Sequence, residues 1–294
     1  MLRNPSPLRY PGGKAQLFPL VRDIIVANKL NGATYVEPFA GGAGLALKLL
    51  AEGIVSRIII NDLDAHIFAF WHSVLNECEA LCDMIRRTPV NRKHWRLQRA
   101  IYQQSDSTDL LSLGFATFFL NRTNVSGVLT GGMIGGKCQE GKYKLDARYD
   151  KKSLIDKISL IAKQREHILL FNDDAIDFLK RDEVTALKKS LINFDPPYVQ
   201  KGAALYKNSF TETDHRRLAK VILACRKKWI VTYDVCPLVT ELFKSRRMGQ
   251  IGVYYSARNP RLAKECIILS NNVKMPNDMI ILDMGKIVGQ ERRI

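Results

Sequence analysis

The chain reads Thr34-Tyr35-Val36-Glu37-Pro38-Phe39-Ala40-Gly41-Gly42-Ala43-Gly44 where its first predicted strand, 34–36, passes into a glycine-rich turn. The helix predicted after the turn covers 45–52. Glycines directly after a strand let the backbone approach a ligand without a Cβ clash. A second strand, 57–60, ends in Asn61-Asp62, which places Asp62 20 residues after Gly42. That separation is typical of an acid that reaches a ribose hydroxyl in a dinucleotide-type fold, although an ordinary tight turn is the alternative.

The ligand expected at this turn is a nucleoside without phosphates. Position 47 is Leu47 where the dinucleotide fingerprint has its third glycine, so a pyrophosphate on the helix N-terminus is less expected. S-adenosylmethionine fits, with its adenosine toward Asp62 and its amino-acid head near Lys14 or backbone amides. Gly12-Gly13-Lys14 is not predicted to be a phosphate loop, because the upstream glycine and the following Ser or Thr are absent.

The remaining sequence alternates short apolar segments with amphipathic ones. This alternation predicts an α/β fold of the Rossmann-like type with a mostly parallel sheet. Further strands are expected at 167–171, 190–194, 229–233 and 266–270, and helices at 14–29, 153–163, 175–180 and 212–227.

Between about residues 72 and 152 the alternation stops, which we interpret as an insertion. Residues 86–151 contain twelve Lys and Arg against five Asp and Glu, a net charge of +7. Arg92, Lys93, Arg96 and Arg99 are predicted to line one helix face that tracks phosphates, with a solvated charged face as the alternative. The glycine-punctuated stretch 126–148 is interpreted as a β-hairpin loop that enters a groove of DNA.

The apolar strand 190–194 is followed by Asp195-Pro196-Pro197-Tyr198. The two prolines restrict φ and donate no N–H, so this strand end is rigid. The Asp195 carboxylate and the Pro196 carbonyl are suited to accept both hydrogens of an exocyclic amine, with Tyr198 stacked on the ring that carries it. The alternative is a simple turn after a strand.

Composition narrows the class of partner. The 294 residues are 46% hydrophobic and carry a formal charge of +16, which predicts a polyanionic partner, most simply nucleic acid, with an anionic membrane as the alternative. No apolar run of roughly 18 residues predicts a spanning helix, and residues 1–10 lack a signal peptide's apolar core. We therefore expect a soluble, cytoplasmic protein.

The six cysteines form no CxxC pair and the five histidines complete no zinc-ligand spacing, so no metal is expected.

Six segments, in this order along the chain, resemble the motifs of the Dam-type (D12 class) DNA adenine N6-methyltransferases. They are Leu8-Arg9-Tyr10-Pro11-Gly12-Gly13-Lys14, Glu37-Pro38-Phe39-Ala40-Gly41-Gly42-Ala43-Gly44, Asn61-Asp62, Asn121-Arg122, Asp195-Pro196-Pro197-Tyr198 and Asn208-Ser209-Phe210. The resemblance implies a methyltransferase-type sheet with one reversed strand. It implies a catalytic domain at 1–72 and 152–294, with a target-recognition insertion at 73–151. S-adenosylmethionine would be the methyl donor, and an adenine flipped out of double-stranded DNA the acceptor.

The motif positions and the charge pattern together give the candidate site residues. The catalytic set is Asp195, Pro196, Pro197 and Tyr198. The cofactor set is Tyr10, Lys14, Glu37, Phe39, Gly41, Gly42, Gly44, Asp62, Asp173, Asp174 and Asp195. The DNA set is Arg9, Arg92, Lys93, Arg96, Arg122, Asn124, Ser126, Val128, Thr130, Lys137, Lys142 and Lys144.

The insertion departs from the members of this family that read GATC. Where those carry Asn-Gly-Leu-Cys-Arg, this chain has Ser126-Gly127-Val128-Leu129-Thr130, so the base-reading arginine is absent. A bidentate Arg–guanine contact accounts for roughly 1–3 kcal/mol of discrimination, which Thr130 cannot reproduce. Val128 is predicted to wedge between bases. Methylation of RNA adenine and a non-catalytic DNA-binding role are the alternatives, and a separate restriction endonuclease and a monomer or weak dimer are compatible with the main interpretation.

Overall fold

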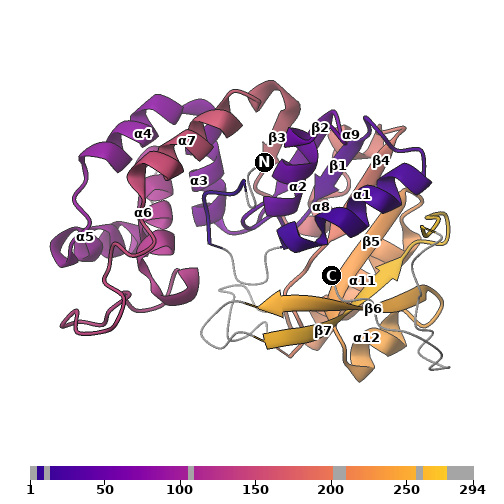
Figure 1. Ribbon diagram of the computed structural model, residues 1–294. Coiled ribbons are helices and arrows are strands. Elements are labelled where there is room, and N and C mark those ends of the chain that lie inside the picture. The colour runs from indigo at the N-terminus through magenta and orange to yellow at the C-terminus, as the bar shows by residue number, and fades with distance from the viewer. Residues whose placement is uncertain (1–4, 10–13, 105–108, 201–209, 256–260, 277–294) are drawn as a thin grey trace.

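One mixed sheet forms the centre of the protein (Figure 1). The computed structural model describes residues 5–9, 14–104, 109–200, 210–255 and 261–276. Within these residues the sheet has seven strands in the order β3-β2-β1-β4-β5-β7-β6. The strands are β1 (Thr34–Glu37), β2 (Arg57–Asn61), β3 (Ile168–Phe171), β4 (Ser190–Phe194), β5 (Lys228–Asp234), β6 (Arg247–Tyr255) and β7 (Arg261–Leu269).

Strands β1 to β5 are parallel, and β7 runs antiparallel to both β5 and β6. The predicted α/β sheet with one reversed strand is therefore confirmed. Strand order changes direction between β1 and β4, which lie side by side. In open α/β sheets, ligands bind beyond the carboxyl ends of the strands at such a switch point. Both the glycine-rich turn and Asp195 follow these two strands.

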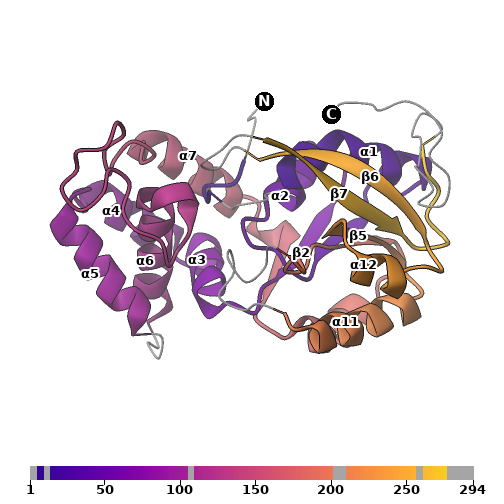
Figure 2. The same ribbon diagram turned by 90° about the horizontal axis from the view of Figure 1, so that it is seen from below.

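Helices cover both faces of the sheet (Figure 2). On one face, α1 (Phe18–Ala27), which follows the short 3-10 helix η1 (Lys14–Leu17), packs beside α2 (Gly44–Ala51). Neighbouring strand residues point to opposite faces, so Tyr35 joins the core beneath α1 and α2, whereas Val36 joins the core beneath α11. The second face carries α8 (Ala175–Phe178), α9 (Asp182–Thr185), α11 (Glu212–Ala224) and α12 (Pro237–Leu242).

A helical lobe lies to one side of the sheet, on the left in Figure 1. It contains α3 (Ala65–Asn76), α4 (Cys78–Arg87), α5 (Arg92–Gln103), α6 (Leu110–Thr123) and α7 (Lys151–Ala162), and α7 leads through the 3-10 helix η3 (Arg165–His167) to β3. Phe118 of α6 stacks on Phe70 of α3 with ring centroids 5.8 Å apart. Helix α3 packs against α6, and α7 packs against α4. The lobe therefore also includes residues 65–72 and 152–162, which lie outside the predicted insertion at 73–151. No helix among the described residues is long and apolar enough to span a membrane.

Two sequence predictions differ from the structure. The predicted β-hairpin at 126–148 is wrong: this segment consists of turns, after the 3-10 helix η2 (Val125–Gly127), and its one isolated bridge among the described residues pairs Asn124 with Met133. Side chains satisfy its carbonyls in place of a partner strand, as where Gln139 bonds the carbonyls of Ile134 and Gly136. Strand β6 was not predicted, because its glycines and polar residues give no apolar pattern.

Candidate active site

A cleft opens at the carboxyl ends of β1, β2 and β4. Its walls combine the glycine-rich turn with Lys14, Asp62, Asp195 and Pro197, and the lobe closes one side with residues 127–130. Segments that are far apart in the sequence thus meet at one place. The structure brings together the predicted catalytic and cofactor segments, as far as they are described; Tyr10 lies outside the described residues.

Asp62 holds the glycine-rich turn in place. Its Oδ2 accepts a hydrogen bond from the Gly41 N–H at 2.7 Å, and its Oδ1 accepts one from the Asp64 N–H at 3.0 Å. Gly41 has a φ of 47°, in the left-handed region that favours glycine. Burial raises the pKa of Asp62 to about 6. Because Asp62, Gly41, Gly42 and Gly44 all line the cleft, the turn presents its backbone to whatever occupies it.

The Asp195 carboxylate is anchored through one of its two oxygens. Oδ1 accepts hydrogen bonds from the Thr232 hydroxyl at 2.7 Å and from the Tyr198 hydroxyl at 3.3 Å, and it lies 3.0 Å from Lys14 Nζ. Among the described residues, none donates to Oδ2 or to the Pro196 carbonyl. Burial raises the pKa of Asp195, although Lys14 opposes this shift. The described residues therefore fix one carboxylate oxygen, Oδ1, and none of them donates to the other.

Lys14 lies between two carboxylates. It is 6% exposed, and its Nζ lies 3.6 Å from Oε2 of Glu265, a fully buried residue of β7. Burial alone would lower the pKa of Lys14, but Asp195 and Glu265 outweigh it, so this pKa is raised. The lysine is therefore a stable cation at the base of the cleft. Glu265 was not among the predicted site residues.

Tyr198 lies deeper than the sequence predicted. Its side chain is 6% exposed, and its hydroxyl donates to Glu265 Oε2 at 2.7 Å. The backbone that follows is held by Asp234, whose carboxylate accepts the N–H groups of Val199 and Gln200 at 3.0 and 2.7 Å. Stacking of Tyr198 on a base stays a prediction, because in this structure its ring does not line the cleft.

Aromatic side chains nevertheless line the cleft. Phe39 and Phe210 meet edge to face with ring centroids 6.0 Å apart. Phe39 belongs to the predicted cofactor set, whereas Phe210 is the last residue of the motif Asn208-Ser209-Phe210 and had no predicted role. The two rings supply an apolar surface for a flat ligand beside Asp195.

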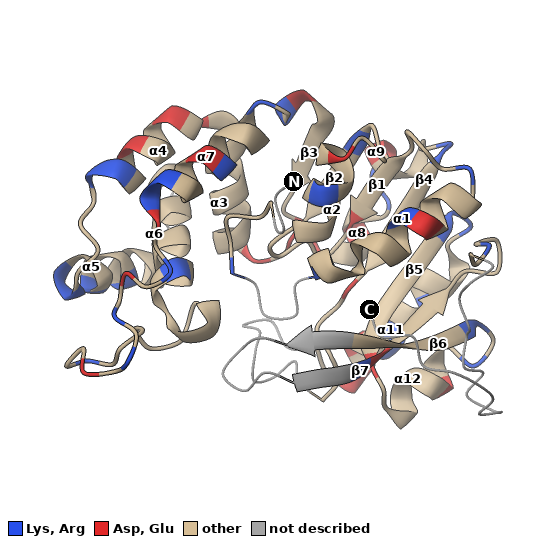
Figure 3. Ribbon diagram, in the orientation of Figure 1, with Lys and Arg blue, Asp and Glu red and all other residues tan. Residues whose placement is uncertain are grey.

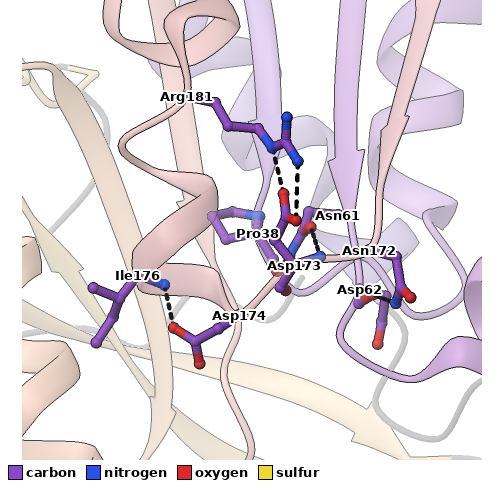
Figure 4. A network of polar contacts seen from close by, with 8 residues as sticks. All are labelled: Pro38, Asn61, Asp62, Asn172, Asp173, Asp174, Ile176 and Arg181. Carbon is purple, nitrogen blue, oxygen red and sulfur yellow. Dashed lines mark hydrogen bonds and ion pairs between the residues drawn. The ribbon is translucent and has the colours of Figure 1, made fainter.

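Asp173 and Asp174 line the cleft, and their carboxylates are held by neighbouring groups of the protein (Figure 4). Asp173 forms a two-pronged ion pair with Arg181, and its N–H donates to Asn61 at 2.9 Å. Asp174 caps α8 by accepting the Ile176 N–H at 2.9 Å. Both carboxylates thus have structural partners, and the predicted contact of these residues with the cofactor adenine stays a prediction.

The buried amide of Asn121 holds the N-terminal residue Arg9 against the lobe. The Asn121 Oδ1 accepts the Arg9 N–H at 2.7 Å, and its Nδ2 donates to the carbonyls of Arg9 at 2.9 Å and Gly127 at 3.0 Å. Gly127 has a φ of 77°, and a Cβ there would lie 2.3 Å from the Arg9 carbonyl oxygen. The chain leading to Lys14 and the loop that closes the cleft are therefore tied together.

Comparison with known proteins identifies the family. The family model of D12 class N6 adenine-specific DNA methyltransferases matches residues 10–256. The chain belongs to this family. A curated relative, the Type II methyltransferase M.MjaIII of Methanocaldococcus jannaschii, is 23% identical over 231 residues, which cover 72% of this chain and 77% of that protein. Membership of this family makes DNA the substrate and N6 of adenine the methylated atom.

Solved structures similar to this methyltransferase are more distant. A SAM-dependent methyltransferase from Agrobacterium tumefaciens is 11% identical with a TM-score of 0.38, and the match covers 87% of this chain and 62% of that chain. The rRNA methyltransferase aviRa from Streptomyces viridochromogenes is 12% identical with a TM-score of 0.35, covering 90% and 88%. The strand order and the strand directions described above define the fold of the chain.

Two groups can be distinguished among the predicted DNA-binding residues of the methyltransferase. Exposed cations lie on α5 and in the loop between α6 and α7, where Figure 3 shows Lys and Arg in blue. This group consists of Arg92, Lys93, Arg96, Lys137, Lys142 and Lys144. Although exposed, Arg92 donates to the Lys137 carbonyl at 3.0 Å, and Lys144 donates to the Gln139 carbonyl at 2.6 Å. The charges of this group are therefore all at the surface.

The second group serves the lobe itself. Arg122 donates to the Arg148 carbonyl at 2.8 Å and the Pro7 carbonyl at 3.3 Å, and burial lowers its pKa to about 10. Asn124 is fully buried and donates to the carbonyls of Val128 and Leu129 at 2.9 and 3.0 Å. Both side chains shape the loop, and the Asn124 amide is already bonded through its nitrogen and its oxygen, so the structure gives no support to a direct DNA contact by Asn124.

The sequence missed three polar residues around Asp195. Thr232, Asp234 and Glu265 lie inside or at the edge of predicted apolar strands. A polar residue in such a strand indicates only that a hydrogen-bond partner lies nearby, because a buried polar group needs one, and it does not say which residue the partner is. Only the pairing of β5 with β7 reveals what these residues hold: it places Asp234 directly opposite Glu265.

Proposed function

We propose that this methyltransferase transfers a methyl group from S-adenosylmethionine to N6 of an adenine rotated out of double-stranded DNA, with Asp195 as the residue that binds the amine. The observation that carries the proposal is the asymmetry of the Asp195 carboxylate. Donors from the protein occupy Oδ1, and among the described residues none occupies Oδ2 or the adjacent Pro196 carbonyl. Two acceptors on consecutive residues match in number the two hydrogens of an exocyclic amine.

The two acceptors do chemical work on the amine. The N6 lone pair of adenine is delocalised into the purine ring, so the amine is a poor nucleophile. Hydrogen bonds to Asp195 Oδ2 and the Pro196 carbonyl favour a tetrahedral nitrogen and localise the lone pair. Positive charge then develops on nitrogen, and fixed acceptors stabilise that charge without reorganising. Alignment of the nitrogen with the methyl group supplies the second large contribution.

The cleft also suits the methyl donor. S-adenosylmethionine, when bound, supplies an electrophilic methyl group on a positively charged sulfur. Glu37 and Asp62 line the cleft, and burial raises their pKa values to about 8 and about 6. Acids that are costly to ionise in the empty cleft favour a cationic ligand. Asp62 and the glycine-rich turn lie where the ribose is expected.

Double-stranded DNA is proposed to lie along the lobe. The exposed cations of α5 and the loop between α6 and α7 attract phosphates. The half-buried Val128 and the exposed Thr130 lie in the segment that closes the cleft, where a rotated base would enter. Thr130 stands where GATC-reading members carry arginine, so we propose a recognition sequence other than GATC.

The test compares Asp195, which lines the cleft, with an aspartate at the protein surface. Asp195→Ala should abolish methylation of adenine in a host free of DNA methylation, as read by long-read sequencing of its genome. Asp177→Ala, which removes a fully solvent-facing carboxylate paired with Lys180, should leave methylation unchanged. Methylation that persists at the same sites in Asp195→Ala would refute the role of Asp195, and methyl-adenine found only in RNA would refute the DNA substrate.

A further inference from the structure

Glu265 is a buried carboxylate to which the proposed methyl transfer assigns no role. It lies on β7, the reversed strand, and its side chain is fully buried. Its Oε2 accepts the Tyr198 hydroxyl at 2.7 Å and lies 3.6 Å from Lys14 Nζ. Burying a carboxylate is costly unless it is paired and hydrogen-bonded, so its position implies that these contacts matter.

The contacts of Tyr198 show what Glu265 changes. The Tyr198 hydroxyl has a second acceptor, Asp195 Oδ1, at the longer distance of 3.3 Å. The Lys14 ammonium lies 4.9 Å from the centre of the Tyr198 ring. Without Glu265, the hydroxyl would lose the nearer of these two acceptors, and the lysine would lose an anion 3.6 Å from its Nζ. Both changes act on the carboxylate that is proposed to bind the amine.

We propose that Glu265 is a positioning residue for methyl transfer: by holding the Tyr198 hydroxyl and sharing Lys14, it fixes the ring and keeps Asp195 Oδ2 directed into the cleft. The inference rests on the proposed role of Asp195. A second carboxylate, Asp234, lies next to Glu265 and holds a different part of the same region. Asp234, opposite Glu265 in the β5–β7 ladder, holds the backbone of Val199 and Gln200, whereas Glu265 holds side chains.

The experiment is a double-mutant cycle between Glu265→Gln and Tyr198→Phe, measured as single-turnover methylation of plasmid DNA from a methylation-free host. We expect each single variant to lose 10-fold or more in rate, with the Kd for S-adenosylmethionine changed less than 3-fold. Because the two residues act through one hydrogen bond, the double variant should lose less than 3-fold beyond the slower single variant. Glu241→Gln, at a surface ion pair with Arg216, is the matched control and should keep its rate.

Several outcomes would overturn the inference. Full activity of Glu265→Gln, or multiplication of the two losses in the double variant, would show that Glu265 does not act through Tyr198. If Glu265→Gln does not fold, Tyr198→Phe decides alone, because it removes only the hydroxyl and must reproduce the loss of rate. The proposed function fails separately: it falls if Asp195→Ala stays active, whereas the inference falls if Asp195 is required and Glu265→Gln is fully active.

Discussion

Glu37, at the end of β1, should make the stability of the empty protein depend on pH in an unusual direction. Its side chain is 5% exposed, and it lines the cleft. Burial, with a contribution from the charge of Asp195, raises its pKa from 4.5 to about 8. Between these two values the folded protein keeps the proton that the unfolded chain releases. Stability contributed by Glu37 is therefore present below about pH 4.5 and is lost as the pH rises toward 8.

The size of this effect follows from the width of the interval. A pKa shift of one unit corresponds to about 1.4 kcal/mol, so the rise from 4.5 to about 8 corresponds to about 5 kcal/mol. Glutamine has nearly the shape of the protonated acid but does not ionise. Glu37→Gln should therefore match the wild type near pH 5 and become more stable than it by several kcal/mol near pH 8.5.

Urea unfolding at several pH values measures this difference directly. The gap between variant and wild type should widen steadily from pH 5 to pH 8, and S-adenosylmethionine should close part of it above pH 8, because a cation stabilises the ionised acid. Glu241→Gln is the control, since Arg216 lowers the pKa of Glu241 at the surface and no such widening is expected. Parallel stability curves for Glu37→Gln and the wild type would refute the argument.

Two further predictions concern the lobe. Gly127→Ala and Gly136→Ala both place a side chain at positive φ, 77° and 74°, but only at Gly127 does the new Cβ meet the Arg9 carbonyl, so only Gly127→Ala should lose more than the roughly 1–2 kcal/mol of left-handed strain in thermal unfolding. Arg99 donates to the carbonyls of Leu129 and Thr130 at 2.8 and 3.2 Å, whereas Arg96 is exposed. Arg96→Gln should weaken DNA binding and reduce the slope of log K against log salt concentration by about one unit, whereas Arg99→Gln should reduce methylation more than it reduces DNA binding. Equal salt slopes for the two variants would contradict this division.

The fold could be predicted largely from local signals. The apolar run of β4 is buried at every position, as continuous apolar strands of parallel sheets are, and the glycine-rich turn marked where β1 ends. Strand β6 could not be predicted, because it is an edge strand held by backbone pairing with β7, with Gly249 and Gly252 in its interior. The loop at 126–148 was mispredicted for a related reason: its glycines suit hairpins, but its carbonyls accept hydrogen bonds from side chains, both its own Gln139 and Arg99 of α5.

The site shows the same limit. Motifs placed Lys14, Asp62 and Asp195 correctly at one cleft, because each follows a recognisable local pattern. Glu265 could not be found this way, since its role depends on Tyr198, which is 67 residues away along the chain. That contact exists only because β7 is reversed and lies beside β5, a pairing of long range that no local pattern specifies.

One cleft is lined both by the lobe and by the segments that surround the glycine-rich turn. Residues 127–130 of the lobe line the same cleft as Lys14 and the glycine-rich turn. Asn121 bonds both Arg9, five residues before Lys14, and Gly127, so one buried amide fixes the loop relative to the N-terminal segment. If this loop contacts DNA as proposed, we expect a shift of the loop to be transmitted through Asn121 to Arg9, close in sequence to Lys14, whose Nζ lies 3.0 Å from Asp195 Oδ1. Under the proposed function, the orientation of Asp195 would then depend on the position of the loop.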